Sequence, residues 1–380
     1  MAFRARHGVP APTSMARVQI ALVVTSALAL RVPLRTPMRR IRQSPLRATN
    51  DYLASISAPE PAPSIKPKAL DENSISGDTF LGAFYKFTRP HTIRGTMLAA
   101  FAGVVKAIGD AGGIAKCWSW GLVPRALAGL VALLCGNAFI VGINQLYDVD
   151  VDQINKPFLP IAAGELSPKR AKLILTACAL IGPSVVFALY PPLIVSLYLF
   201  GTFVGTAYSV PPFRLKSRGP IFAGLAIACC RGFLLNFGVY YAVLEALKVP
   251  FKWSPGVAFM ARFMTAFAGV IAVTKDLPDI AGDLATGVPT LATKFGVGKV
   301  AAGATFALLA NYASAIGQGL ASSSFKKLPM VGGHALLAGF LLRNYRRYRA
   351  AGAEDPDAVK GYYKSIWDNF YLEYLLYCFI

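Results

Sequence analysis

Residues 133–152 are LLCGNAFIVGINQLYDVDVD, an apolar run that ends in aspartates at positions 148, 150 and 152. Residues 264–283, MTAFAGVIAVTKDLPDIAGD, repeat this plan with aspartates at positions 276, 279 and 283. Apolar runs of about twenty residues are typical of helices that cross a bilayer. Carboxylates are costly inside a bilayer, so they are expected where such a helix reaches the surface. The two segments therefore predict two transmembrane helices that each end in an acidic cluster.

The rest of the chain extends this pattern. Of its 380 residues, 55% are hydrophobic and 15% are charged, and its mean hydropathy is +0.49. Such values are unlike those of a soluble globular protein. We therefore expect an all-α fold, a transmembrane helical bundle of about nine helices around a central cavity. The expected spans cover approximately residues 92–109, 122–146, 168–189, 191–209, 220–243, 256–276, 298–319, 329–347 and 361–380.

The two acidic segments also indicate an internal repeat. Each ends a long span, contains an Asp-x-x-x-Asp pair and is followed by a loop with a proline, Pro160 in the first and Pro289 in the second. Related halves of a membrane protein often face each other across a shared binding site. The sequence thus predicts a pseudo-repeat of two halves whose acidic clusters border one cavity.

The N-terminal segment carries much of the formal net charge of +20. Nine arginines precede Asp51, the first acidic residue, and residues 18–30 form a short apolar core. Arginine-rich, acid-free segments are typical of transit peptides, and a short apolar core is typical of signal peptides. We interpret residues 1–50 as a plastid targeting segment, residues 51–77 as a disordered linker and residues 78–380 as the transmembrane domain. A targeting role for this charge argues against nucleic acid as a partner.

Charges in the connecting loops indicate how the bundle is oriented. The loops on the side of the acidic clusters are rich in lysine and arginine, whereas the opposite loops hold few. By the positive-inside rule, the richer side faces the compartment from which the protein is inserted. In a thylakoid or an inner envelope membrane, that compartment is the stroma.

The acidic clusters have the composition of a cation site. Helical spacing places three polar side chains of each segment on one face: Asn144, Asp148 and Asp152 in the first, and Asp276, Asp279 and Asp283 in the second. A single carboxylate there could simply be solvated at the membrane surface, but several close together repel one another unless a cation lies between them. Oxygen ligands without histidine or cysteine suit Mg²⁺, which binds through a few carboxylates and substrate phosphates. The clusters therefore predict a magnesium and diphosphate site.

Both acidic motifs, together with five flanking segments, resemble the signature of the UbiA superfamily of intramembrane aromatic prenyltransferases, and within it the plastid homogentisate branch. The resemblance covers roughly residues 78–380. The segments that carry it are RPHTIRGT at 89–96, NKPFLPIAAG at 155–164, YSVPP at 208–212, RGFLLNFG at 231–238 and TKDLPD at 274–279.

This resemblance implies a fold of nine transmembrane helices around a central cavity, with a lateral opening for the lipid chain. It also implies Mg²⁺-dependent catalysis by Asp148, Asp152, Asp279 and Asp283, with Asn144 as a further metal ligand. Asp276 joins the metal ligands through its helical spacing to Asp279 and Asp283.

Three basic residues near the clusters are candidates for binding the diphosphate. Arg214 and Lys216 lie in a short loop after the YSVPP segment, and Lys275 adjoins the second cluster. Cations there could hold the leaving group as it departs. The first two could equally be positive-inside anchors, and Lys275 could simply offset the charge of its acidic neighbours.

Arg231 is the most informative candidate for binding the acceptor. It lies within an apolar span, where an unpaired guanidinium facing lipid would cost several kcal/mol, so we expect it to face the inside of the bundle. It could hold the acceptor carboxylate or the diphosphate, or it could form a structural pair with an acidic residue. Arg94, Asn236 and Tyr208 are further candidates for the acceptor site, whereas His91 is too isolated to be assigned as a base.

The resemblance implies a polyprenyl (solanesyl) diphosphate as donor, homogentisate as acceptor and loss of CO2, on the path to plastoquinone. A phytyl-type transferase of the tocopherol pathway and a chlorophyll synthase are alternatives within the same class. A membrane transporter is an alternative from another class, because repeats with central sites are also found in transporters. In each case the protein is expected in a plastid membrane, in contact with membrane lipid.

Overall fold

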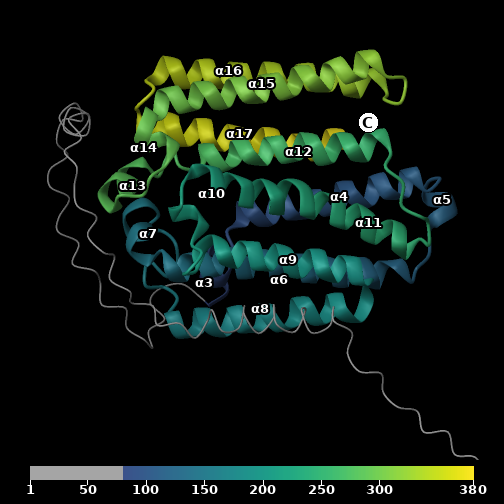
Figure 1. The fold of residues 1–380 in the computed structure, drawn as a ribbon, viewed down its shortest axis with the longest axis horizontal. Coiled ribbons are helices and arrows are strands. Elements are labelled where there is room, and N and C mark those ends of the chain that lie inside the picture. The colour runs from purple at the N-terminus through teal and green to yellow at the C-terminus, as the bar shows by residue number, and fades with distance from the viewer. Residues whose placement is uncertain (1–79) are drawn as a thin grey trace, which may run out of the picture.

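The computed structural model describes residues 80–380, and these form a bundle of helices that lie side by side (Figure 1). The targeting segment expected at residues 1–50 and the linker expected at residues 51–77 lie outside the described residues. Within the described part of the chain there is no strand. The predicted all-α class is therefore confirmed.

Nine long helical segments make up this bundle, as expected from the apolar stretches. They are α4 (Pro90–Asp110), α6 (Leu122–Tyr147), α8 (Pro168–Leu189), α9 (Pro192–Ser209), the continuous α10 (Pro220–Ile227), η2 (Ala228–Leu234) and α11 (Leu235–Ala246), α12 (Pro255–Thr274), α15 (Val297–Ala321), η3 (Leu328–Gly333) with α16 (His334–Ala351), and α17 (Pro356–Tyr377).

Short helices connect the long ones at the two ends of the bundle. They are α3 (Phe80–Phe87), α5 (Ile114–Cys117), α7 (Val149–Asn155), η1 (Leu215–Ser217), α13 (Ile280–Thr286) and α14 (Leu291–Phe295). Figure 1 shows α7, α13 and α14 gathered at one end and α5 at the other.

Seven of the nine segments, from α4 through α15, are long and apolar enough to cross a membrane. The segments at residues 328–351 and 356–377 are as long but carry more charge, yet Figure 1 shows α16 beside α15, and α17 beside α12. The last helix begins at Pro356, five residues earlier than expected from the apolar pattern. Asp355 explains this start, because its side chain accepts a hydrogen bond of 2.7 Å from the backbone N–H of Ala358.

Two helix starts inferred from Ser-Pro pairs are confirmed. The Ser167 side chain accepts a hydrogen bond from the N–H of Arg170, and the Ser254 side chain accepts one from Val257. A proline follows each serine at the first helical position, where its missing N–H costs nothing.

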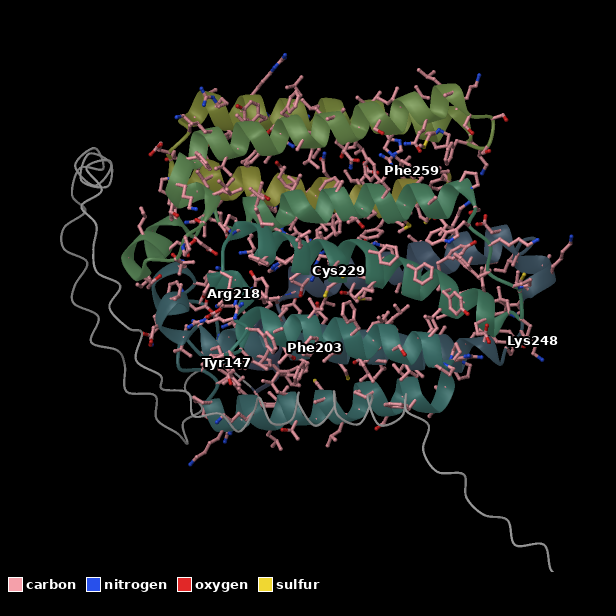
Figure 2. The ribbon with its side chains drawn as sticks, in the orientation of Figure 1. Tyr147, Phe203, Arg218, Cys229, Lys248 and Phe259 are labelled. Carbon is pink, nitrogen blue, oxygen red and sulfur yellow. The ribbon has the colours of Figure 1, made fainter. Side chains whose placement is uncertain are left out.

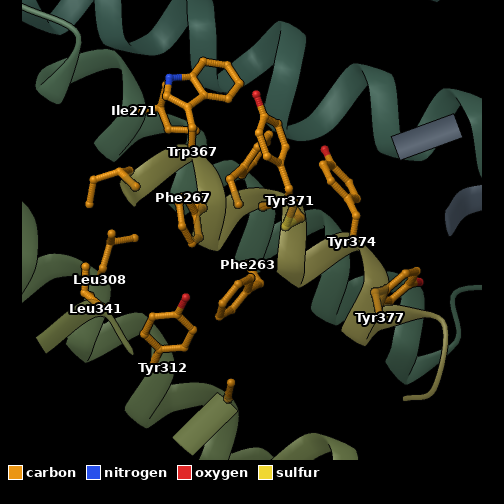
Figure 3. Packing of buried hydrophobic residues seen from close by; sticks show 14 of the residues in the cluster. Phe263, Phe267, Ile271, Leu308, Tyr312, Leu341, Trp367, Tyr371, Tyr374 and Tyr377 are labelled. Atoms are coloured by element: carbon orange, nitrogen blue, oxygen red, sulfur yellow. The ribbon is translucent and has the colours of Figure 1, made fainter. Parts of the chain in front are cut away.

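The largest apolar core lies among α12, α15, α16 and α17. Figure 3 shows Phe263, Phe267 and Tyr312 packed together there, all less than 2% exposed. In the opposite half, a smaller core holds α6 and α8 together around Phe139 and Leu175. Neither core fills the space between α4, α6, α9 and α11, and this is where the candidate site lies.

Tyr147 and Arg218 lie at the end of the bundle where α7 and α13 gather, and Lys248 lies at the opposite end (Figure 2). The loops predicted to be rich in positive charge all connect helices at the α7 and α13 end. The acidic clusters and the most basic loops therefore share one end of the protein.

Candidate active site

Each acidic cluster lies where a long helix breaks into a short one. Helix α6 ends at Tyr147, Asp148 leaves helical geometry (φ −118°, ψ 18°), and α7 starts at Val149. Likewise α12 ends at Thr274, and α13 starts after Asp279. The expectation of one unbroken helical face in each cluster is wrong, because the chain turns at both sites.

The breaks nevertheless bring the two clusters together. The Asn155 side-chain oxygen at the end of α7 accepts a hydrogen bond of 2.8 Å from the backbone N–H of Gly282 in α13. A Cβ atom at position 282 would lie 2.3 Å from that oxygen, so only glycine permits this contact. Lys156, which follows α7, pairs with Asp279, which precedes α13. Side chains and backbone therefore fix the two halves against each other.

The predicted metal ligands all line one cavity of about 850 Å³: Asn144, Asp148, Asp152, Asp276, Asp279 and Asp283. Asp150 is exposed and is not among the lining residues, as its position in the motif indicated. The convergence of both clusters on one cavity agrees with the expected arrangement of two halves.

Basic side chains neutralise some of these carboxylates. Lys216 pairs with Asp148, and the Arg214 Nη2 atom lies 3.5 Å from an Asp148 oxygen. Lys275 pairs with Asp276. All three predicted diphosphate-binding residues therefore line the cavity and contact the acidic clusters.

Two carboxylates, Asp152 and Asp283, have no ion pair within residues 80–380. Burial raises the pKa of Asp152 to about 6, although the charges of Arg89 and Lys156 act against the rise. Burial also raises the pKa of Asp283 to about 7, and the nearby Asp276 and Asp279 add to the rise. One Asp152 oxygen is buried without a hydrogen-bond partner. A bound cation would stabilise the charged form of both carboxylates.

The donor set fits Mg²⁺ in its chemistry, because it consists of carboxylate and amide oxygens. In the described part of the chain, however, no three acidic, histidine or cysteine side chains are close enough to hold a metal by themselves. Mg²⁺ commonly completes its shell with water and substrate phosphate oxygens. The residues therefore fit a metal ion that binds together with a phosphate-bearing ligand, whose oxygens complete the coordination shell of the metal.

Two cations at this end were not identified as site residues from the sequence. Lys156 was counted only as a loop charge, although it reaches across to the second cluster. Arg89 lines the cavity from the position before α4, where its φ of 53° is unusual for a residue other than glycine. The pairing of Lys156 with Asp279 is a tertiary contact across 123 residues, and no local sequence signal indicates it.

Arg231 faces the cavity from η2, a π-helical turn within the membrane span. Its guanidinium carbon lies 5.5 Å from the centre of the Trp367 ring, and its Nη1 atom is buried without a hydrogen-bond partner. No carboxylate in residues 80–380 forms an ion pair with it, so the structural pair considered above is not found there. A buried donor without a partner is costly and points toward a ligand.

The other three acceptor candidates differ in placement. Tyr208 lines the cavity, but Arg94 and Asn236 do not. Arg94 is exposed and lies over the Tyr371 ring at 5.4 Å, and buried Asn236 donates a hydrogen bond of 2.6 Å to the Gly232 carbonyl. The Arg94 side chain lies against α17 and the Asn236 side chain bonds to the backbone of its own helical segment, so neither reaches the cavity. This placement does not support an acceptor role for either residue.

Beyond the charged residues, the cavity continues as an apolar space along the bundle. On α6 its lining runs from Asn144 back to Leu122, a distance of roughly 33 Å at 1.5 Å per residue. Arg125 and Tyr190 lie at its far end, where the tyrosine hydroxyl donates a hydrogen bond of 2.8 Å to the Arg125 carbonyl. The cavity therefore joins a charged head to an apolar body that is nearly as long as the bundle.

Comparison with known proteins agrees with this arrangement. Residues 96–367 match the model of the UbiA prenyltransferase family. Over 295 residues, 77% of this chain and 76% of its relative, the sequence is 49% identical to a probable chloroplastic homogentisate phytyltransferase 2 of Oryza sativa subsp. japonica. It is 48% identical to the chloroplastic homogentisate solanesyltransferase of Arabidopsis thaliana over 303 residues, 79% of this chain and 77% of that one.

A solved structure shows the same fold. The UbiA homolog from Archaeoglobus fulgidus bound to GPP and Mg²⁺ superimposes with a TM-score of 0.56 at 17% identity, covering 78% of this chain and 100% of that chain. At this identity the similarity concerns the fold alone, and it agrees with a multi-span helical membrane protein.

Proposed function

This chain belongs to the UbiA prenyltransferase family, in the plastid homogentisate branch, and on that premise we propose that it transfers a solanesyl group from its diphosphate to homogentisate with loss of CO2. The product would be a methyl-solanesyl-benzoquinol, a precursor of plastoquinone. The observation that carries the proposal is the single cavity that joins both acidic clusters to a long apolar body.

We assign the diphosphate to the charged head of this cavity. Asp148, Asp152, Asp279 and Asp283, with Asn144 and Asp276 beside them, would hold Mg²⁺, which when bound neutralises charge on the diphosphate. Arg214, Lys216 and Lys275 pair with carboxylates in the structure, and we propose that they donate hydrogen bonds to diphosphate oxygens when the donor is bound.

These cations stabilise the leaving group as the bond between donor carbon and oxygen breaks and the electron pair leaves with the diphosphate. The donor carbon becomes an allylic cation, and the electron-rich ring of the acceptor attacks it. We assign the acceptor carboxylate to Arg231, whose buried Nη1 atom is without a partner, and a place beside the ring to Tyr208. The carboxylate leaves as CO2, and the carbon that carried it takes a proton to become a methyl group.

The length of the apolar body supports a long donor. Each isoprene unit extends roughly 5 Å, because it spans four carbon–carbon bonds of about 1.5 Å. Four units, as in a phytyl or geranylgeranyl chain, would therefore leave part of the roughly 33 Å path empty. Nine units exceed this path, so the tail of a solanesyl chain must fold back or leave between helices into lipid.

A donor panel tests the proposal. Purified protein would be given labelled homogentisate with geranyl, geranylgeranyl, phytyl or solanesyl diphosphate in turn, and kcat/KM would be measured for each. We expect the highest value with the solanesyl donor. A higher value with the phytyl donor would favour the alternative of a phytyl-type transferase, the activity in the name of one relative. Absence of transfer to homogentisate from every donor would contradict the acceptor assignment.

The same proposal places the protein in a plastid membrane, with the active-site entrance at the end rich in lysine and arginine. Its relatives are described as chloroplastic, and its apolar helices make it a multi-pass membrane protein. We propose that this end faces the stroma. Protease protection of intact plastid membranes would test it, because the loop at residues 213–219 should be cleaved from the stromal side.

A further inference from the structure

His91 is a cavity residue that the reaction outlined above does not use. It lies in the first turn of α4 and lines the cavity, where its side chain is accessible. Its ring meets the Trp367 indole edge to face, with the centroids 5.1 Å apart and the planes at 80°. Its backbone carbonyl accepts a hydrogen bond of 2.7 Å from Tyr371, which fixes this turn against α17. No hydrogen bond to either ring nitrogen is formed within residues 80–380.

The groups around this imidazole are cations and aromatic rings. Arg89 and Arg94 belong to the same stretch of chain, Arg231 approaches from η2 and Lys156 from the end of α7. Trp367 and Tyr371 face it from α17, and Figure 3 shows these two rings beside each other. A neutral imidazole has one ring nitrogen with a free lone pair, which can accept a proton.

His91 also lies where the acceptor ring is expected. The Trp367 indole contacts both the His91 ring and the Arg231 guanidinium. One small aromatic acid bound through its carboxylate to Arg231 would therefore place its ring near His91. This step rests on the proposed function, because it takes the acceptor carboxylate to be bound by Arg231.

The transfer reaction leaves a proton that must be removed. When the ring attacks the donor carbon, a new carbon–carbon bond forms and the attacked ring carbon holds both the prenyl group and its original hydrogen. The carbon–hydrogen bond must then break, its electron pair returns to the ring, and the proton needs an acceptor. An arginine side chain cannot take this proton because it is always charged, and we have assigned Asp152 and Asp283 to the cation site.

We propose that His91 is the general base that takes this proton from the ring carbon of the acceptor. One lone pair of the neutral imidazole binds the proton, and the ring regains its aromatic electrons, so the charges balance without a further reactant. One proton is added to the methyl carbon on loss of CO2, and one proton is removed from the ring carbon by His91. The overall reaction therefore needs no net proton from outside.

Replacing His91 with phenylalanine separates this role from a structural one, because phenylalanine keeps the contact with Trp367 but has no lone pair. We expect His91→Phe to lower kcat by about 10²–10⁴-fold, the usual contribution of a general base, with little change in the acceptor KM. Met97→Ala is the matched control, since Met97 is an exposed residue of α4 that does not line the cavity. It should behave like the wild type.

A kinetic isotope effect gives the sharper readout. With homogentisate deuterated at the ring carbons, the wild type should show no effect on kcat, because ionisation of the donor limits the rate. His91→Phe should show a primary effect, because proton removal becomes slow. Exogenous imidazole should restore His91→Ala, which leaves space for it, and should not restore His91→Phe.

The outcomes distinguish this proposal from the proposed function. Slow hydrolysis of the prenyl diphosphate without acceptor should be unchanged in His91→Phe, which shows that the variant is folded and still ionises the donor. If this variant does not fold, His91→Gln is measured in the same way. Wild-type kcat in the variant, or a loss of kcat without an isotope effect and without rescue by imidazole, would overturn the role of His91. Absence of transfer to homogentisate by the wild type would instead overturn the proposed function.

Discussion

The two ends of the cavity differ in how they are built. At the head, charged side chains from residues 148–156, 214–216 and 275–279 contact one another, as in the pairs Lys156–Asp279 and Lys216–Asp148. At the far end, the wall is made mainly of apolar side chains and glycine, together with Arg125 and Tyr190. The head holds the charged groups that the reaction needs, and the body can discriminate between donors by their shape. A substitution at the head should therefore abolish reaction with every donor, and one in the body should change which donor is preferred.

The largest effect is expected from the acidic clusters. Asp148→Ala or Asp279→Ala removes a predicted metal ligand and leaves Lys216 or Lys156 without its partner. We expect kcat to fall by about 10²–10³-fold or more with every donor, since charge on the leaving group is no longer neutralised. Steady-state transfer assays in detergent, with thermal unfolding as a check on folding, would measure this.

Asp150→Ala is the matched control for the same motif, because Asp150 is exposed and does not line the cavity. It should retain activity close to that of the wild type, and EDTA should stop transfer in both until Mg²⁺ is restored. Normal turnover in either cluster variant would remove the metal assignment. A loss confined to one donor would contradict the division between head and body.

A smaller effect is expected where head and body meet, at Arg231. Arg231→Met keeps much of the side-chain volume but removes the unpartnered donor. A hydrogen bond to a charged group contributes about 1.5–3 kcal/mol, so the acceptor KM should rise roughly tenfold to a hundredfold while the donor KM changes little. Varying each substrate in turn measures both constants.

Arg94→Met serves as the control, because Arg94 lies outside the cavity and over Tyr371. Its acceptor KM should stay within about twofold of the wild-type value, as is usual for surface positions. Should the donor KM rise in Arg231→Met instead, the guanidinium would belong to the diphosphate site. An equal rise of acceptor KM in both arginine variants would contradict the difference in placement.

These two arginines show what the sequence can and cannot predict. An arginine inside an apolar span must face inward, and Arg231 does, because the cost of exposing its charge to lipid leaves no alternative. Arg94 lies near the membrane surface, where a charge is tolerated in any direction, so its contact with Tyr371 could not be inferred from the sequence. The direction of a charged side chain can thus be predicted only where exposing its charge to lipid would cost free energy.

The same contrast applies to the fold. The nine helices and the starts at Ser167 and Ser254 follow from apolar length and local capping, both of which are local properties. The break at Asp148 and the contact of Asn155 with Gly282 depend on the facing half of the protein. They therefore cannot be predicted from the local sequence. The residues at the far end of the cavity were not predicted, because they are of the same types as those that pack the core.

The smallest effect is expected at that far end, and it tests whether the body selects the donor. The Cβ atom of Gly129→Ala would lie 2.2 Å from the Tyr190 hydroxyl oxygen, so the tyrosine must move and lose its hydrogen bond to the Arg125 carbonyl. A shifted ring occupies space that the tail of a long chain needs. Each buried CH₂ contributes about 0.8 kcal/mol, so losing one or two such contacts should lower kcat/KM roughly fourfold to fifteenfold for the solanesyl donor. Transfer from the geranylgeranyl donor should be unchanged, because four units do not reach this end.

Two further variants test whether the contact with the Tyr190 hydroxyl causes the loss of activity. Gly109→Ala adds a methyl group to α4, where nothing lies within 4 Å of the new atom. This variant should leave kcat/KM unchanged for every donor. The double variant Gly129→Ala with Tyr190→Phe removes the clashing hydroxyl and leaves the next ring atom 3.1 Å from the new methyl, a tight but tolerable contact. It should recover most of the solanesyl activity. An equal loss with both donors in Gly129→Ala would mean that the far end supports folding and not donor choice, and the selecting residues would then have to lie closer to Arg231, where even a short chain must pass.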